Sequence, residues 1–481
     1  MLERGATFAA LDQDRDLSVE FAHENLRGAT IARTSQIGGG LNLWGGQLAC
    51  PVPLEFEEKG DGMPWPIALE ELTRHFQVLG EIMGQRFELP LRNQISTSTS
   101  SKLNNVGLSW IATAWLRRPK FPRNVWRELS VSESVRIFHG VFVDQLEVDR
   151  QTGLVSGAAA LRKDGSRIKF IADTVVIAGG TIETCRLLLL PSSIKERQPW
   201  HALHWLGRGF NEHLDADTAV IEPINRSQLV DIFDPVVRAG TKYLPKLFAR
   251  ISVDPETSLS AVAMPSFQGN VRNNVAELVM LARSLTPREL PGSYDKLILA
   301  AVGSTREALP LAWRYLRHKR IGSIIRNSCI LRVSVEQPVR AENRITLSAS
   351  MCDRFGIPLP QLEWRKGEEE GRVFAEMTKR FKCWAEENSI AKVNIDPELE
   401  ADAYGFASRT DEGFHHAGGT RMASAATHGV VGPDLQVFGT RGLYCCGASI
   451  LPRSGYSNPT LTAMALAVRL GEKLSVERGR K

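Results

Sequence analysis

The segment from Gly442 to Lys473 constrains the fold of this chain more than any other stretch. Its first part, Leu443 to Cys446, is an apolar run with the length of a short strand. The run ends at Gly447, and a glycine there lets another group approach the backbone closely. Asn458 and Pro459 then indicate a helix start, because Asn is a favoured N-cap and Pro suits the first helical position. The free N–H groups at such a helix end favour an anionic ligand.

A histidine-containing turn precedes this segment, and it reads His415-His416-Ala417-Gly418-Gly419-Thr420-Arg421-Met422. A histidine in a glycine-rich turn suits the role of a general base, because its reference pKa is ~6.5. Adjacent residues of an extended turn point in different directions, so we expect only one of the two histidines to act as the base. A histidine held by backbone hydrogen bonds in the core is the structural alternative for either residue.

Together the two motifs resemble the glucose–methanol–choline (GMC) family of flavin oxidoreductases in type, order and spacing. The resemblance covers nearly the whole chain. It implies an α/β fold with a Rossmann-like FAD-binding domain and an α+β substrate domain, the latter built on a largely antiparallel sheet. The residues that carry the resemblance are His415, Gly418, Arg421, Met422, Ser449, Pro452 and Asn458 to Thr462.

The resemblance implies an enzyme that oxidises a CH–OH group to a carbonyl, with a proton passing to a histidine base and a hydride to flavin N5. His415 is the expected base, because it stands six residues before Arg421 as in the family, and His416 is the alternative. Asn458 matches the second catalytic position, where it would bond the substrate oxygen, unless its side chain caps the helix instead. The expected substrate is a sugar, polyol or other alcohol. The electron acceptor stays open, so oxidase and dehydrogenase remain alternatives.

A glycine-rich loop, Ile37 to Leu48, has five glycines in twelve residues, which allow a backbone to lie flat against a ligand. The resemblance places this loop beside the flavin, and a plain surface loop is the alternative. The loop lacks the histidine that some relatives use to attach the cofactor, so we expect non-covalent FAD. Gly447 replaces an Asp that is common in the family. The positions that the resemblance assigns to FAD are Glu3, Gly38, Gly39, Gly40, Trp44, Gly45, Gly46, Val143, Gly179, Gly447, Ala448, Ser449, Pro459 and Thr460.

The N-terminal residues, Met1 to Gly5, have the pattern of a strand end, and Glu3 is the acidic residue that would bond the adenosine ribose. The first strand and the G-x-G-x-x-G turn, which should precede Glu3 by ~20–30 residues, are missing. We therefore expect a chain truncated within its FAD-binding domain. The alternative to an active enzyme is a non-catalytic remnant that acts at most as a binding or partner protein.

The resemblance and the apolar pattern divide the chain into two domains. We expect an FAD-binding domain of residues 1–56, 130–215 and 410–481, and a substrate domain of residues 57–129 and 216–409. His213 is expected to be structural. Expected strands cover residues 134–148, 155–161, 170–180, 218–221, 247–253, 260–265, 330–336 and 344–347. Expected helices cover residues 69–83, 274–285, 294–309 and 368–387, and the polar run 92–105 is an expected loop.

The composition argues against several other classes of protein. A net charge of +5 over 481 residues, without a long Lys/Arg run, gives no ground for nucleic-acid binding. Seven cysteines without regular spacing argue against a disulfide framework and favour reduced thiols in a cytoplasmic protein. No apolar run approaches the ~20 residues of a membrane span, and residues 1–16 lack the apolar region of a signal peptide. The His and Cys spacings predict no metal site.

Overall fold

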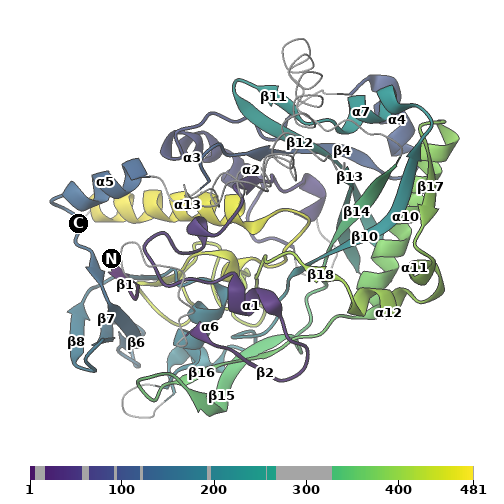
Figure 1. The fold of residues 1–481 in the computed structure, drawn as a ribbon. Coiled ribbons are helices and arrows are strands. Elements are labelled where there is room, and N and C mark those ends of the chain that lie inside the picture. The colour runs from purple at the N-terminus through teal and green to yellow at the C-terminus, as the bar shows by residue number, and fades with distance from the viewer. Residues whose placement is uncertain are drawn as a thin grey trace, which may run out of the picture.

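A large antiparallel sheet occupies one side of the molecule (Figure 1). The computed structural model describes residues 1–5, 17–56, 64–91, 95–119, 123–191, 197–255, 257–266 and 328–479. Within this part the strand path is β17-β10-β14-β13-β12-β4-β3, with β11 beside β12 and β18 beside β10. These pairs are antiparallel, as expected for the substrate domain. The strands are β3 (Gln47–Leu48), β4 (Ser109–Trp115), β10 (His213–Pro223), β11 (Val236–Arg238), β12 (Thr241–Ser252), β13 (Ser258–Ser266), β14 (Cys329–Glu336), β17 (Ala391–Ile395) and β18 (Asp411–Glu412).

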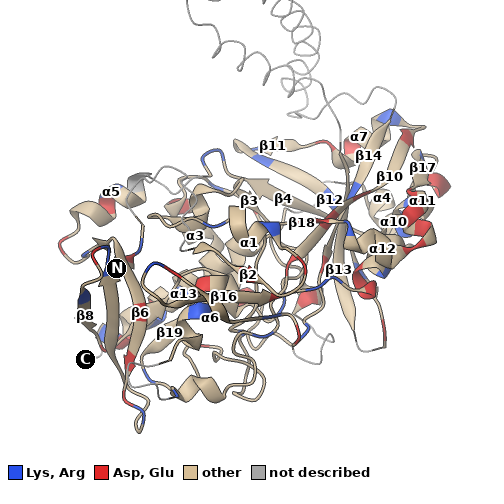
Figure 2. Ribbon diagram, turned by 60° about the horizontal axis from the view of Figure 1, so that its bottom comes forward, with Lys and Arg blue, Asp and Glu red and all other residues tan. Residues whose placement is uncertain are grey.

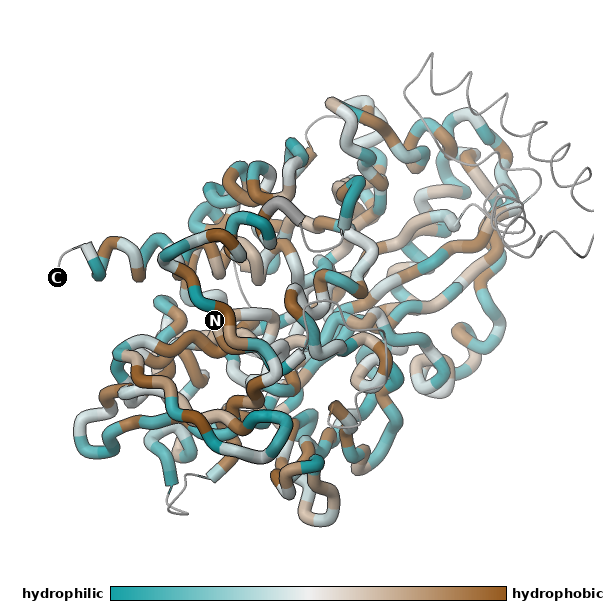
Figure 3. The backbone as a smooth tube through the Cα atoms, turned by 60° about the vertical axis from the view of Figure 1, so that its left-hand side comes forward, coloured by the Kyte–Doolittle hydropathy of each residue, from teal (hydrophilic) through white to brown (hydrophobic). Residues whose placement is uncertain are grey.

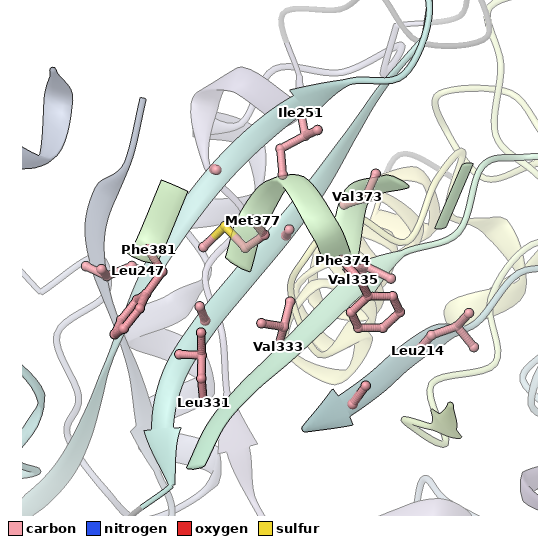
Figure 4. Packing of buried hydrophobic residues seen from close by; sticks show 14 of the residues in the cluster. Leu214, Leu247, Ile251, Leu331, Val333, Val335, Val373, Phe374, Met377 and Phe381 are labelled. Atoms are coloured by element: carbon pink, nitrogen blue, oxygen red, sulfur yellow. The ribbon is translucent and has the colours of Figure 1, made fainter. Parts of the chain in front are cut away.

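One face of this sheet is apolar, because successive side chains of a strand point to opposite faces and every second one here is hydrophobic. In β14 the buried apolar residues on this face are Cys329, Leu331, Val333 and Val335. Helix α10 (Glu368–Glu387) covers this face with Phe374 and Phe381, which lie two helical turns apart (Figure 4). The alternation of hydropathy along the strands is visible in Figure 3.

The opposite face of the sheet is polar. It carries His213 and Asp215 in β10, Lys246 in β12 and Glu336 in β14, all of them offset by one residue from the apolar positions. The strand register sets His213 directly beside Glu336. Arg453, from the C-terminal segment, donates to both carboxylate oxygens of Glu336 at 2.7 and 2.9 Å. The polar face therefore lies against the segment that carries the sequence motifs.

The remaining described strands form small sheets that include three parallel pairs, one of which joins β2 (Glu20–Phe21) to β16 (Pro358–Glu363). β1 (Leu2–Glu3) pairs with β5 (Phe138–His139), and β9 (Val175–Ile177) pairs with β19 (Leu443–Cys445). Ligands of α/β proteins bind beyond the carboxyl ends of parallel strands, so the residues after β9 and β19 are candidates for cofactor contacts. The other small sheets comprise β6 (Val141–Val148), β7 (Val155–Arg162) and β8 (Arg167–Ile171), and β15 (Arg344–Cys352), β16 and β2.

Two helices begin beyond these parallel strands. α6 (Thr181–Leu189) follows β9, and α13 (Pro459–Gly479) follows β19 and packs on α2 and α3 (Figure 1). The further helices are α1 (Arg27–Ile31), α2 (Glu70–Thr73), α3 (Phe76–Ile82), α4 (Thr97–Asn104), α5 (Arg123–Val131), α7 (Arg226–Phe233), α11 (Pro397–Ala401) and α12 (Ala403–Ser408). Short 3₁₀ turns are η2 (Gly39–Asn42), η3 (Pro53–Glu55), η4 (Pro199–Ala202) and η5 (Ala448–Ile450).

Four expected elements were wrong in their extent or type. The expected strand 134–148 is two strands, because β5 pairs with β1 whereas β6 pairs with β7. The expected strand 170–180 is two strands, because Phe170 pairs with β7 whereas Val175 pairs with β19 in another sheet. The expected helix 69–83 divides into α2 and α3. The expected loop 92–105 contains α4, whose N-cap Ser96 accepts from the N–H of Thr99 and whose Leu103 is buried. The expected helices 274–285 and 294–309 lie outside the described residues.

The surface mixes both signs of charge (Figure 2). The basic residues of α10 pair with acids one turn away, as in Arg372 with Glu368 and Arg380 with Glu376. All seven cysteines are free thiols. In the described part of the chain, each helix falls short of the length and apolarity that a membrane crossing requires.

Replacing Phe381 by Ala should lower the free energy of unfolding by about 3–5 kcal/mol, because the ring is fully buried between α10 and the sheet and leaves a cavity. Urea denaturation measures this loss. Arg372→Ala is the matched control on the same helix, and it should leave stability nearly unchanged because the Arg372–Glu368 pair is exposed. Equal losses in both variants would contradict the assigned packing.

Candidate active site

The histidine turn is fixed along both of its edges by backbone hydrogen bonds. On one edge Asn211 and Ala417 exchange two hydrogen bonds of 3.0 Å just before β10. On the other edge the N–H groups of Gly418, Thr420 and Met422 donate to the carbonyls of Ala448, Ser449 and Ile450. The two motifs found in the sequence therefore lie side by side, and both adjoin the start of β10.

A buried carboxyl and a strained residue orient the turn. One oxygen of Glu212, Oε1, accepts from the N–H of His213 at 2.8 Å and from the N–H of His415. Phe414 has a φ of 61°, a left-handed conformation that costs a non-glycine residue ~1–3 kcal/mol and is enriched at functional sites. The chain thus reverses immediately before His415 and turns the His415 ring toward β10.

His415 contacts two polar side chains, one at each ring nitrogen. Its Nε2 lies 2.7 Å from Nδ2 of Asn458, and its Nδ1 lies 2.9 Å from Nδ1 of His213. The surrounding protein shields the ring from water and lowers the pKa of His415 well below 6.5, and His213, Lys246 and His416 lower it further. The ring is therefore neutral near pH 7, which is the protonation state that a general base requires.

Asn458 directs its side chain to His415, at the residue before α13 begins. A helix cap would use the other amide atom, Oδ1, as an acceptor, so this Nδ2 contact is compatible with capping and the substrate-facing role of Asn458 stays a prediction. Pro459 and Thr460 form the first turn of α13, whose amino end points to this region.

His416 lies on the other side of the turn, away from Asn458. Its Nε2 is 3.5 Å from Oε2 of Glu212, and its carbonyl accepts from the Thr181 hydroxyl at 2.7 Å. Burial lowers the pKa of His416 to about 3 and raises the pKa of Glu212 to about 8. At neutral pH the contact joins two uncharged groups. The two histidines thus occupy different environments, as expected for adjacent residues of a turn.

The first glycines of the predicted flavin loop border open space. Gly38 and Gly39 have positive φ values of 89° and 46°. A Cβ atom added at Gly39 or Gly40 would meet no atom within 4 Å, so this half of the loop has room for a ligand along its backbone.

The second half of the loop instead packs against the protein. A Cβ at Gly46 would lie 2.4 Å from Cβ of Pro119, and the Trp44 indole donates to the Pro119 carbonyl. A Cβ at Gly45 would lie 3.5 Å from the ring of Trp115. Close packing beside β4 accounts for these three positions without a ligand.

The residues beyond the parallel strands form a second open region. Gly180 precedes α6 and Gly447 precedes η5, and a Cβ added at either would meet no atom within 4 Å. Gly179, the predicted position, lies closer to α6, with a Cβ 3.5 Å from Glu183. The buried hydroxyl of Ser449 has no hydrogen-bond partner within the described residues, and Ala448 precedes it in η5. Open backbone and an unpaired hydroxyl fit a cofactor with phosphate and ring groups.

Glu3 lies in β1 and Val143 lies in β6, and these two strands contact each other. Oε1 of Glu3 accepts from the N–H of Gly5 at 2.8 Å. Val143 sits at a register shift in the pairing of β6 with β7. Their predicted contacts to adenosine stay predictions.

Sequence reasoning missed Glu212 and Lys246, and it gave His213 only a structural role without a partner. His213 and His415 are 202 residues apart, so no local pattern joins them. Lys246 is only 8% exposed, and burial lowers its pKa to about 8. Its charge lowers the pKa of both His213 and His415. The sequence feature that could have indicated Lys246 is its place as a charged residue between the apolar residues Pro245 and Leu247 of β12.

Glu212, His213 and His415 also offer three possible metal-ligand atoms within 4.8 Å of one another, a group that the sequence spacing did not indicate. Hydrogen bonds already engage these atoms, since Glu212 holds two N–H groups and the two histidines contact each other. The arrangement is accounted for without an ion, and the expectation of no metal site stays a prediction.

Replacing Glu212 by Gln should flatten the dependence of stability on pH. The folded-state pKa of about 8 lies above the ordinary 4.5, so between these values the folded state holds a proton that the unfolded state has released. The wild type therefore loses unfolding free energy as pH rises through this window, by up to ~1.4 kcal/mol per pH unit. Gln keeps the accepting oxygen but does not titrate. Urea denaturation between pH 4.5 and pH 8 should show that the unfolding free energy of the variant rises relative to that of the wild type as the pH rises. Parallel plots of unfolding free energy against pH would contradict the raised pKa of Glu212.

Residues 339–467 match the protein family described as GMC oxidoreductase. The C-glycoside 3-oxidase of Arthrobacter globiformis is 29% identical to the chain over 140 residues, which are 29% of the chain and 25% of that protein. The long-chain-alcohol oxidase of Arabidopsis thaliana is 24% identical over 235 residues, which are 46% of the chain and 30% of that protein. The matches thus span about a quarter to a third of the length of these curated relatives.

The fold is similar to that of pyridoxine 4-oxidase from Mesorbium loti, with a TM-score of 0.56 at 14% identity. The superposition covers 98% of the chain and 93% of that structure, and it confirms the expected fold class. The match of residues 339–467 and the partial matches to these two oxidases support the resemblance to the glucose–methanol–choline oxidoreductase family that the sequence motifs indicate.

Proposed function

We propose that this protein binds FAD and oxidises a CH–OH group of a sugar, polyol or related alcohol to a carbonyl, with His415 as the base. The observation that carries the proposal is the 2.7 Å contact between Nε2 of His415 and Nδ2 of Asn458 at the start of α13. An amide nitrogen only donates, so the Nε2 atom that it contacts is an acceptor. A neutral histidine with an accepting nitrogen beside a fixed donor is a suitable receptor for an alcohol group.

A substrate hydroxyl inserted between these side chains would donate its proton to Nε2 of His415. Asn458 Nδ2 would donate to the same oxygen and hold it in place. As the O–H bond breaks, the carbon becomes a better hydride donor, and bound FAD supplies the acceptor, N5. The C–H and O–H bonds of the substrate would break: the hydride would carry two electrons to the flavin, the proton would form a bond to Nε2 of His415, and the C–O single bond would become C=O.

The residues proposed to hold FAD are those that border open space, Gly39, Gly40, Gly180 and Gly447, together with Ser449. The amino end of α13, at Pro459 and Thr460, would stabilise negative charge on the reduced ring through its free N–H groups. Because residues 37–48 contain no histidine, attachment is expected to be non-covalent.

The sugar-like substrate class rests on two features. The polar sheet face near His415 carries Asp215, Lys246 and Ser334, which can donate to and accept from several hydroxyls. The relative from Arthrobacter globiformis is a C-glycoside 3-oxidase, whose name also denotes oxidation of a sugar-derived compound. The electron acceptor stays open.

Replacing His415 by Ala should reduce the turnover of an alcohol substrate by ~10²–10⁴-fold, the range for loss of a general base. Stopped-flow reduction of the flavin under anaerobic conditions measures the step directly, over a panel of sugars and polyols. His416→Ala is the matched control and should retain far more activity, because His416 faces Glu212 rather than Asn458. A large loss with His416→Ala and little with His415→Ala would assign the base to His416.

The purified protein should show the visible absorbance of an oxidised flavin, and acid precipitation should release that flavin into the supernatant. The glycine-rich loop, residues 37–48, would lie against the cofactor and contains no histidine that could attach it. Flavin that stays with the precipitated protein would contradict non-covalent binding. A protein without flavin absorbance, even after incubation with FAD, would overturn the proposed function.

A further inference from the structure

The proposed reaction requires a lone pair on Nε2 of His415, and a chain of hydrogen bonds in the structure decides which nitrogen has it. The chain starts at the carbonyl oxygen of Gly455, which can only accept. Nε2 of His213 lies 2.6 Å from this oxygen. His213 must therefore carry its proton on Nε2.

The other proton positions follow from this one. Burial lowers the pKa of His213 below its ordinary value, so the ring is neutral and its Nδ1 is an acceptor. Nδ1 of His415 lies 2.9 Å away, so it must be the donor of this hydrogen bond. A neutral His415 with a proton on Nδ1 has its lone pair on Nε2. The contact at the other end of this hydrogen-bond series leads to the same tautomer. Nδ2 of Asn458 lies 2.7 Å from Nε2 of His415 and can only donate, so Nε2 must accept.

We infer that His213 is a positioning residue, which holds His415 in the tautomer with the proton on Nδ1 and so directs the Nε2 lone pair toward the substrate hydroxyl. The kinetic part of this inference rests on the proposed function. Without an acceptor at Nδ1, the two neutral tautomers of His415 would both be available, and the one protonated at Nε2 could not take the substrate proton.

The geometry favours this role over simple packing. The side chain of His213 is almost fully buried, and both of its ring nitrogens are used in hydrogen bonds. The rings of His213 and His415 meet edge to face, with centroids 5.0 Å apart. The proton transfer itself needs no further reactant, because the substrate O–H bond breaks as the Nε2–H bond of His415 forms. Nδ1 of His415 continues to donate to His213 and shares the new positive charge.

The charges that act on the histidine pair come from several elements. Glu212 precedes His213 in the chain, Asp215 lies two residues after it on the same strand, and His416 follows His415. Glu336 from β14 and Lys246 from β12 approach from the sheet. Replacing His213 also changes how these groups act on His415, so the test must report the tautomer of His415 as well as the rate.

Two variants of similar polarity separate positioning from packing. The amide oxygen of His213→Asn can occupy nearly the place of the ring Nδ1 and accept from His415. The longer side chain of His213→Gln can reach the Gly455 carbonyl but leaves no acceptor at the Nδ1 place. We expect His213→Gln to slow flavin reduction by ~10–100-fold with little change in KM, the usual effect of losing such an outer hydrogen bond. His213→Asn should retain most of the rate.

The tautomer is read directly from the flavin-loaded protein by nitrogen-15 NMR of the histidine rings. The signals of His415 are identified by their absence in His415→Asn. The wild type and His213→Asn should show a protonated Nδ1 and an unprotonated Nε2, whereas His213→Gln should show a mixture of the two forms.

Each result bears on the inference separately from the proposed function. A wild-type His415 protonated on Nε2 would overturn the inference, even if neither variant folds. Equal rate losses in both variants, with an unchanged tautomer, would assign His213 to packing and also overturn it. If the tautomer shifts as expected while no alcohol reduces the flavin, the positioning role stands and the proposed function fails.

Discussion

The site depends on one buried carboxyl, that of Glu212. A single oxygen of this group accepts the backbone N–H groups of His213 and His415, and so joins the first residue of β10 to a turn 202 residues further along the chain. Burial keeps the carboxyl protonated at neutral pH, with a pKa of about 8, so the junction adds no charge beneath the histidines. The left-handed Phe414 is held in place by the same contacts.

The large sheet connects this junction to the stability of the fold. Its apolar face packs on α10 and fixes the position of β14, whose residue Glu336 lies beside His213 on the polar face. Arg453 donates to Glu336 and so attaches the C-terminal segment to the sheet. Because α10 and the site lie on opposite faces, the core can be tightly packed while the polar face remains available for hydroxyl groups.

The electrostatics of the site follow from burial more than from paired charges. Shielding from water lowers the pKa of His213, His415 and His416 alike, and Lys246 lowers the pKa of the first two further. All three rings are therefore neutral at neutral pH, and their hydrogen bonds decide which ring nitrogen carries the proton. Under the proposed function, a proton taken up by His415 would be held weakly, because the buried ring has a lowered pKa.

The sequence by itself determined those features that are set by local patterns. Helix α10 was predicted with its observed bounds, because apolar residues recur at helical spacing along it. The strands β7, β12, β13 and β14 were predicted from their apolar patterns, and the two motifs indicated the family that residues 339–467 match. Only the tertiary structure decided the rest. It divided residues 170–180 between two sheets, because each half pairs with a different distant strand. It brought His213 to one ring nitrogen of His415 and Asn458 to the other, because hydrogen bonds between residues far apart in the chain leave no periodic trace in the sequence.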